Sequence, residues 1–194
     1  MYPPPPGKSP REDQKKQTHK RIVDAAVDTL HEAGEENVTM MEVAARAGVT
    51  ERTIYRHFRT RRVLLRWVWQ RVLVSDASKR DRQTVDELIK GPRRDFPRWD
   101  ETPEFARSSV YSPEALDARK RLSDVRQQAM LKSVRDAIPV LDEGTIRRRA
   151  AIAELLASSY TWEWLEQLWG LDGAEAGAAA SEALEILLGH RPAG

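Results

Sequence analysis

The residues of this chain that are best suited to chemistry are a group of arginines. Between Arg46 and Arg62 there are six arginines and one acidic residue, Glu51, so this short stretch carries a net charge of +5. Concentrated positive charge on a short exposed helix suits the neutralisation of phosphates. Arginine can also make a bidentate contact with guanine, and a threonine methyl group can contact the thymine methyl. The stretch therefore predicts binding to double-stranded DNA.

Patterns that would indicate catalysis are missing from the sequence. The four histidines lack the spacing of metal ligands. There is no nucleophile elbow, P-loop or glycine-rich dinucleotide motif. The acid pair Glu35-Glu36 falls in an expected surface turn. We therefore predict no enzyme activity, no catalytic residue, no metal site and no cofactor.

The elements that must position the arginines are two short helices joined by a tight turn. Thr39 and Glu42 match a capping box, in which each side chain satisfies a free backbone N–H at a helix start. This first helix is expected to end near Ala47, where Gly48 supplies the left-handed residue. Thr50 then repeats the capping signal. Two helices that meet at a glycine turn form a helix-turn-helix.

The second of these helices is expected to span about Glu51 to Phe58 and to have two faces. Ile54 and Phe58 lie four residues apart and should point inward. The residues expected on the other faces are Arg52, Thr53, Tyr55, Arg56 and His57. In a helix-turn-helix, the N-terminal residues of this recognition helix contact base edges in the major groove.

At these residues the chain resembles the TetR family of transcriptional regulators. The matching segments are Ile22–Ala26, Thr39–Ala44, Ala47–Thr50, Thr53–Phe58 and Leu64–Leu65. The resemblance covers residues 18 to 65, where several spaced motifs agree. It implies that the first three helices bind DNA and that the remaining helices bind a small molecule and form a homodimer. It also implies that the ligand releases the protein from its operator.

The resemblance implies two kinds of DNA contact. Phosphate contacts are expected from Thr39, Tyr55 and His57, and Arg61 matches the basic residue that opens the next helix. The family more often has lysine at that position, and arginine keeps the charge while adding bidentate reach.

The start of the recognition helix is expected to face the groove. The residues placed there by the resemblance are Thr50, Arg52 and Thr53, and Arg56 belongs to the basic group of the same helix. Together with the phosphate contacts, they make up the predicted DNA-binding set.

The chain as a whole is predicted to be all-α, with an N-terminal three-helix DNA-binding domain and a C-terminal helical domain. Its expected parts are a disordered arm (1–13), the DNA-binding domain (14–62) and a ligand-binding and dimerisation domain (63–190). Cysteine is absent and no apolar run reaches about 18 residues, which favours a cytoplasmic protein without a membrane span.

Prolines and caps predict the elements of the second part. A fourth helix should begin at Arg61, and prolines predict an irregular segment over 91–111. One long helix is expected over 112–138, followed by helices over about 142–169 and 173–188.

The last two helices are predicted to form a four-helix bundle with their copies in a second subunit. The first of them is apolar over more than one face, so a second face must be buried. The alternative is that both helices complete the core of the monomer. A twofold dimer would match a palindromic operator.

A small-molecule site is expected in the second part, lined by aromatic and apolar residues. The candidates are Trp67, Trp99, Tyr111, Met130, Tyr160 and Trp164, together with Trp69, Phe96 and Trp162. Any one of them could instead belong to the core. Candidates to orient a polar group of the ligand are Arg71, Arg107, Arg126 and Glu163.

Three hypotheses for function follow. The first is a homodimeric repressor that a small molecule releases from DNA. The second is a ligand-independent DNA-binding regulator or activator that a protein partner controls. The third is a helical enzyme or adaptor with an incidental helix-turn-helix.

Overall fold

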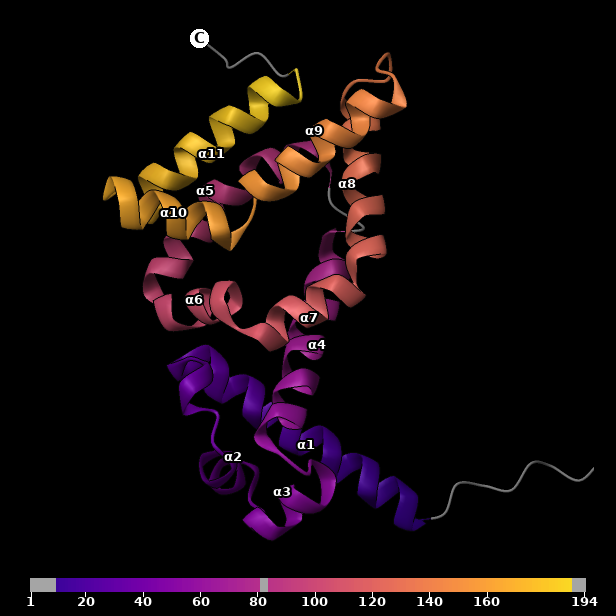
Figure 1. The fold of residues 1–194 in the computed structure, drawn as a ribbon, viewed down its shortest axis with the longest axis vertical. Coiled ribbons are helices and arrows are strands. Elements are labelled where there is room, and N and C mark those ends of the chain that lie inside the picture. Colours follow the sequence, from indigo (N-terminus) through magenta and orange to yellow (C-terminus); the bar gives the residue numbers. More distant parts are fainter. Residues whose placement is uncertain (1–9, 81–83, 190–194) are drawn as a thin grey trace, which may run out of the picture.

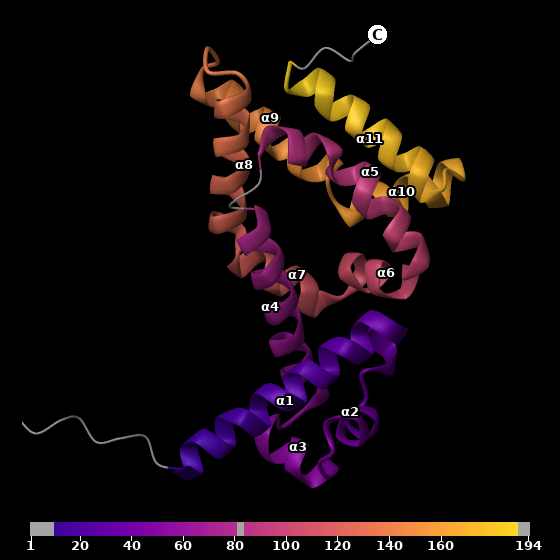
Figure 2. The same cartoon turned by 180° about the vertical axis from the view of Figure 1, so that it is seen from behind.

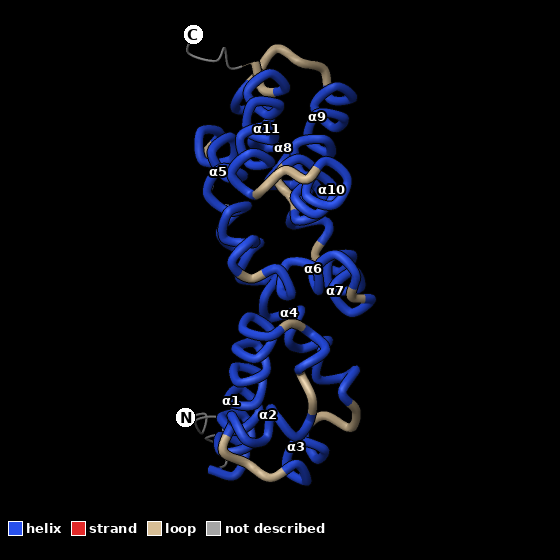
Figure 3. The backbone as a smooth tube through the Cα atoms, turned by 90° about the vertical axis from the view of Figure 1, so that its left-hand side faces the viewer, coloured by secondary structure: helices blue, strands red, loops and turns tan. Residues whose placement is uncertain are grey.

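The computed structural model describes residues 10–80 and 84–189. They form eleven α-helices and one short 3-10 helix, and no strand occurs among them (Figure 1). This architecture confirms the all-α prediction. The first helices form one end of an elongated molecule, the later helices form the other end, and α4 joins the two (Figures 1 and 3).

Helix α1 (Pro10–Ala33) starts earlier than expected. We predicted its start at Gln14, after a disordered arm over 1–13, but residues 10–13 are helical. Proline is favoured in the first turn of a helix, and the acidic Glu12 and Asp13 interact well with its N-terminal dipole. Residues 1–9 of the expected arm lie outside the described residues.

The N-terminal end of the molecule, called the head (residues 10–60), continues with the 3-10 helix η1 (Glu35–Asn37), α2 (Met40–Ala47) and α3 (Glu51–His57). Helix α4 (Arg61–Arg80) follows and runs away from the head (Figure 2). The hydroxyl of Thr60 caps α4 by accepting a hydrogen bond from the N–H of Val63 at 3.2 Å. The cap confirms the predicted start of this helix.

The segment that we expected to be irregular is mostly helical. Helix α5 (Val85–Glu101) contains Pro92 and Pro97 in its interior, and α6 (Pro103–Tyr111) follows. A proline inside a helix removes one hydrogen bond, and packing against other helices can offset that loss. Here α5 packs closely along α11 (Gly173–Leu187). Tertiary packing thus overrides the local signal from proline.

Glycines of α11 permit this close packing. A Cβ atom on Gly177 would lie 2.6 Å from the carbonyl oxygen of Pro92, and one on Gly173 would lie 2.5 Å from that of Phe96. Real Cβ atoms do not approach carbonyl oxygens so closely, so the two helix backbones meet only because both residues are glycine.

The expected single helix over 112–138 is two helices, α7 (Pro113–Arg121) and α8 (Ser123–Ala137). The break falls at Leu122, whose N–H donates to the carbonyls of Ala118 and Arg119. Helix α7 packs against α4, whereas α8 packs against the helix that follows it in the chain. The two halves of the expected helix therefore have different packing partners. The start, capped by Ser112, and the end near Ile138 were predicted correctly.

The expected helix over 142–169 is also interrupted. It consists of α9 (Glu143–Leu156) and α10 (Ser159–Trp169). The hydroxyls of Ser158 and Thr161 both donate to the carbonyl of Leu155 at 2.6 Å, which satisfies this group at the end of α9. The last predicted helix is present as α11, which begins with a capping box of Asp172 and Glu175.

Three apolar clusters hold the helices together. The first joins α1, α2, α3 and the first half of α4 with Ala115 and Ala118 of α7. The second joins α5, α8, α9 and α11, and the third joins α5, α6, α10 and α11. None of the helices within the described ranges is both long and apolar enough to cross a membrane.

Candidate DNA-binding surface and ligand cavity

The first helix of the helix-turn-helix is fixed by Thr39. Its hydroxyl accepts a hydrogen bond from the N–H of Glu42 at 3.1 Å, as predicted. The reciprocal half of the expected capping box is replaced, because the N–H of Thr39 donates to the carbonyl of Asn37 at 2.8 Å. The side chain of Thr39 is exposed at the end of the head.

The turn between α2 and α3 depends on Gly48, which has a φ of +61°. A Cβ atom there would meet nothing within 4 Å, so glycine is favoured by the left-handed backbone and not by lack of space. Thr50 then caps α3 by accepting a hydrogen bond from the N–H of Thr53 at 3.2 Å. The two threonine hydroxyls also lie 3.1 Å apart, which orders the start of α3.

Helix α3 presents one apolar and one polar face, as predicted. Ile54 and Phe58 are fully buried. The side chains of Arg52, Tyr55 and Arg56 are exposed. Helix α3 lies at the end of the molecule that is opposite α9 and α11 (Figure 3). A basic helix on such an end can enter a groove of DNA without obstruction from the rest of the protein.

His57 lies in a small aromatic group between α1 and α4. Its ring centroid is 6.1 Å from that of His19, which lies 4.6 Å from Phe58 and 4.8 Å from Trp67. Burial lowers the pKa of His19 below its ordinary value of 6.5. Burial and the neighbouring positive charges also lower the pKa of His57. Both imidazoles are therefore mainly neutral at neutral pH in the absence of DNA.

The side chain of Arg61 contacts the backbone of an earlier turn. Its Nε donates to the carbonyl of Val38 at 2.9 Å, and its Nη2 donates to the carbonyl of Glu35. These carbonyls belong to the turn before α2. The side chain of Arg61 thus holds the start of α4 against this turn, in addition to the DNA contact that the resemblance implies.

Trp67 is absent from the lining of the cavity described below, contrary to our expectation. Its indole is 47% exposed and packs edge-on against the ring of His19. It lies on the face of α4 that contacts α1. The neighbouring Trp69 is fully buried and points toward the second part of the molecule.

Four other expected ligand residues also lie elsewhere. Tyr111 is 62% exposed and donates to Glu163, and Trp164 is 63% exposed on α10. Met130 is buried in the cluster of α5, α8, α9 and α11. Tyr160 donates to a backbone carbonyl of α6. None of the four contributes to the cavity described next.

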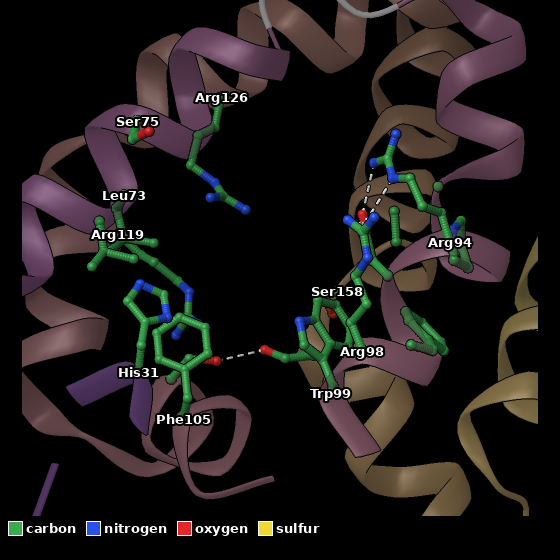
Figure 4. A pocket seen from close by; sticks show the side chains of 18 of the residues that line it. His31, Leu73, Ser75, Arg94, Arg98, Trp99, Phe105, Arg119, Arg126 and Ser158 are labelled. Atoms are coloured by element: carbon green, nitrogen blue, oxygen red, sulfur yellow. Dashed lines mark hydrogen bonds and ion pairs between the residues drawn. The ribbon is translucent and has the colours of Figure 1, made fainter. Parts of the chain in front are cut away.

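A cavity of about 950 Å³ lies in the body of the protein, next to α4. Residues from α1, α4, α5, α6, α7, α8 and the α9–α10 turn line it, and Figure 4 shows their side chains around a central space. Small-molecule sites commonly have volumes of about 300–1,000 Å³. The cavity is thus large enough for a ligand of substantial size.

Aromatic side chains form part of the cavity wall. Among the expected aromatic and apolar residues, Trp69, Phe96 and Trp99 line it. Phe96 stacks on Trp99 with ring centroids 4.9 Å apart, and His31 packs on Phe105 at 4.0 Å. Such surfaces suit the apolar part of a ligand.

The remaining wall is rich in arginine. The arginines that line the cavity are Arg71, Arg94, Arg98, Arg119 and Arg126. Of the four polar candidates from the sequence, Arg71 and Arg126 line the cavity, whereas Arg107 pairs with Glu163 at 3.3 Å. Arg94 and Arg98 were missed. The two arginines are four residues apart, which in a helix places them on one face beside Trp99. This signal was overlooked because the prolines predicted an irregular segment.

Comparisons with known proteins agree with this architecture. A sequence model of the family described as bacterial regulatory proteins, tetR family, matches residues 22–68. No curated protein matches the chain.

Solved structures share the fold of the whole chain. The regulator FadR from Bacillus subtilis, in complex with stearoyl-CoA, has a TM-score of 0.61 and 16% identity, over 89% of this chain and 99% of its own. A tetR-family transcriptional regulator from Streptomyces coelicolor has a TM-score of 0.60 and 20% identity, over 89% of this chain and 80% of its own.

A third similar structure is a protein from Saccharomonospora viridis in complex with choline. It has a TM-score of 0.58 and 18% identity, over 91% of this chain and 97% of its own. At these identities the likeness concerns the fold. The family match shows that residues 22–68, which contain the helix-turn-helix, belong to the type found in the tetR family.

Proposed function

We propose that the protein is a homodimeric, sequence-specific repressor that a small molecule releases from a palindromic operator. The observation that carries the proposal is that one helix, α4, connects the base of the DNA-binding head with the wall of a large cavity. A ligand that moves α4 would move the head to which it is packed. Cytoplasmic localisation follows from the proposed DNA target.

Contacts with DNA are assigned to two sets of residues. Arg52 and Thr53, at the start of α3, face the groove and read base edges. Tyr55, His57 and Thr39 contact phosphates, which fix the register without reading sequence. The exposure of Arg52 and Tyr55 on the outer face of α3 supports this division.

Dimerisation is assigned to the end of the molecule opposite the head. Large apolar side chains are exposed there on three helices. They are Ile152, Leu155, Trp164, Leu168, Trp169 and Ile186. A monomer rarely exposes so many large apolar side chains on adjoining helices unless a partner covers them. A twofold dimer through α9, α10 and α11 would present two copies of α3 to half-sites about one helical turn, or a multiple of it, apart.

The ligand-independent alternative predicts a body without a ligand site. The cavity of about 950 Å³ supports the ligand-responsive function instead. Two proteins of similar fold were solved with small molecules, stearoyl-CoA and choline. Because their identity to this chain is low, they support a ligand in general and not either compound.

The first experiment tests DNA binding. Purified protein is titrated with DNA from directly upstream of its own gene and with a shuffled fragment, at several salt concentrations. We expect tighter binding to the native fragment and a steep loss of affinity with salt. Tyr55→Phe should weaken binding to both fragments about equally. Equal weak binding of the wild-type protein to both fragments would contradict regulation of its own promoter.

The second experiment tests the dimer. Sedimentation at micromolar concentration should give a dimer for the wild type and a monomer for Leu168→Glu. A matched control is Val140→Glu, because Val140 is 91% exposed in a turn outside the proposed interface. A wild-type monomer, or equal effects of the two variants, would exclude the proposed interface.

A further inference from the structure

The charge of the cavity wall is unusual for a site that binds an apolar molecule. Its described lining contains five arginines and two acids, Glu87 and Asp95. Asp24 and Glu154, outside the lining, pair with Arg71 at 3.5 Å and Arg126 at 2.9 Å. Arginines still outnumber acids among the described residues when these two partners are included.

The arginines lie on opposite sides of the space. Figure 4 shows Arg94 and Arg98 of α5 on one side, and Arg119 of α7 and Arg126 of α8 on the other. Positive groups that converge on a cavity with apolar walls raise the electrostatic potential inside it, because field lines concentrate there. An anion in this space would be attracted by the arginines of both walls.

Several of the arginines are held in position by neighbouring groups. Asp95 accepts two hydrogen bonds from Arg94 at 2.8 Å, and it lies 3.9 Å from Nη1 of Arg98. The carboxylate that lies 3.9 Å from Arg98 thus also binds Arg94. Arg119 donates to the hydroxyl of Tyr160 at 3.3 Å and lies over its ring. Side chains held in this way lose little freedom when they bind a ligand.

We propose that the cavity binds an amphipathic anion, a molecule with a carboxylate or phosphate head and an apolar body. The inference rests on the proposed function and names the class of its effector. Guanidinium groups match planar or tetrahedral oxyanions with paired N–H donors. The head would lie between the walls that carry Arg98 and Arg119, and the body would pack on Trp99, Phe96 and Phe105. A quaternary ammonium ligand would meet the repulsion of the same arginines.

The test compares two probes that share an aromatic body. They are 8-anilinonaphthalene-1-sulfonate, an anion, and N-phenyl-1-naphthylamine, which lacks the sulfonate. Fluorescence titration should show that Arg98→Gln with Arg119→Gln weakens binding of the anion about tenfold or more, since charge-assisted hydrogen bonds are lost. Binding of the neutral probe should change less than about twofold, because the apolar wall remains.

A matched control removes two positive charges from the same region. Lys120→Gln with Arg121→Gln changes exposed residues of α7 outside the cavity. It should leave the affinity of the anionic probe within about twofold, because exposed charges are screened. Equal losses in the two double variants, or no loss in the cavity variant, would overturn the proposal. If the cavity variant does not fold, Arg98→Gln alone should still weaken the anion selectively.

Displacement of the bound anionic probe then tests the head group directly. Decanoate, decyl phosphate and decyltrimethylammonium share one chain length and differ in head group and charge. Displacement by either anion but not by the cation supports the proposal and identifies the preferred head group. Displacement by the cation at equal concentration overturns it. None of these measurements needs DNA, so failure here is distinct from failure of DNA binding, which the promoter titration measures separately.

Discussion

The indole nitrogen of Trp69 donates a hydrogen bond to Oε2 of Glu35 across 2.5 Å. Trp69 is a fully buried residue of the cavity wall, and Glu35 opens the short helix before α2. The N–H of Glu35 also donates to the hydroxyl of Ser108 at 2.9 Å, and its carbonyl accepts from Arg61. Glu35 is thus a single residue of the head that contacts the cavity wall, α6 and the start of α4.

Replacement of Glu35 by alanine should weaken this junction. We expect Glu35→Ala to lower the free energy of unfolding by about 1.5–3 kcal/mol, because it removes a charge-assisted hydrogen bond and leaves the Trp69 N–H without its acceptor. Glu36→Ala is the matched control, since Glu36 is exposed on the same turn, and should change stability by about 0.5 kcal/mol or less. Urea unfolding measures both. Equal stabilities of the two variants would contradict the importance of the Trp69 contact.

Arg61 offers a test that separates a structural role from a DNA contact. Because its side chain donates to two backbone carbonyls, Arg61→Ala should lower the free energy of unfolding without DNA by about 1–3 kcal/mol. Arg62→Ala should lower it by about 1 kcal/mol or less, since its pair with Glu114 leaves the guanidinium largely exposed. A stable Arg61→Ala protein that loses DNA affinity would contradict the structural role and support a direct DNA contact.

The close packing of α5 and α11 predicts the effect of one added methyl group. Gly177→Ala would place a Cβ atom 2.6 Å from the carbonyl oxygen of Pro92, so the helices must separate. We expect a loss of about 1–3 kcal/mol in thermal or urea unfolding. In Gly144→Ala of α9 the nearest atoms are side-chain ends at 3.1 and 3.3 Å, and the change should be within about 1 kcal/mol. A neutral Gly177→Ala would show that this helix contact is loose.

The two histidines of the head predict a dependence of stability on pH. The folded protein holds the pKa of His19 and of His57 below 6.5, so the unfolded chain takes up protons first as the pH falls. The free energy of unfolding should therefore decrease as the pH falls below about 6.5 and be restored above it. In His19→Gln the slope over this range should be smaller than in the wild type. An unchanged slope would contradict the contribution of His19.

Local capping signals made the DNA-binding head predictable from sequence. Thr39, Gly48 and Thr50 act within a few residues of themselves, and the structure has each of them in the expected role. The buried positions of Ile54 and Phe58 also follow from helical spacing alone. The backbone partners of Arg61 lie more than 20 residues before it, so its contacts with the turn before α2 could not be read from local signals.

The cavity could not be predicted in the same way, because it depends on contacts between distant helices. Trp67 and Trp69 are two residues apart on α4, and only the packing of α1 decides that Trp67 faces His19 while Trp69 faces the cavity. Pro92 and Pro97 argued against a helix that the glycines of α11 make possible. Without that helix, Arg94 and Arg98 could not be placed on one wall.

The central claim is that the exposed face of α3 reads DNA sequence, and the most direct test is the affinity of Arg52→Ala for the native upstream fragment and its shuffled counterpart. We predict a loss of about 1–3 kcal/mol on the native fragment beyond any loss on the shuffled one, because a base-edge contact disappears. Arg121→Ala, an exposed arginine of α7, should leave both affinities unchanged. If Arg52→Ala binds both fragments as the wild type does, or loses the same affinity for each, α3 does not read the sequence through Arg52 and the claim is wrong.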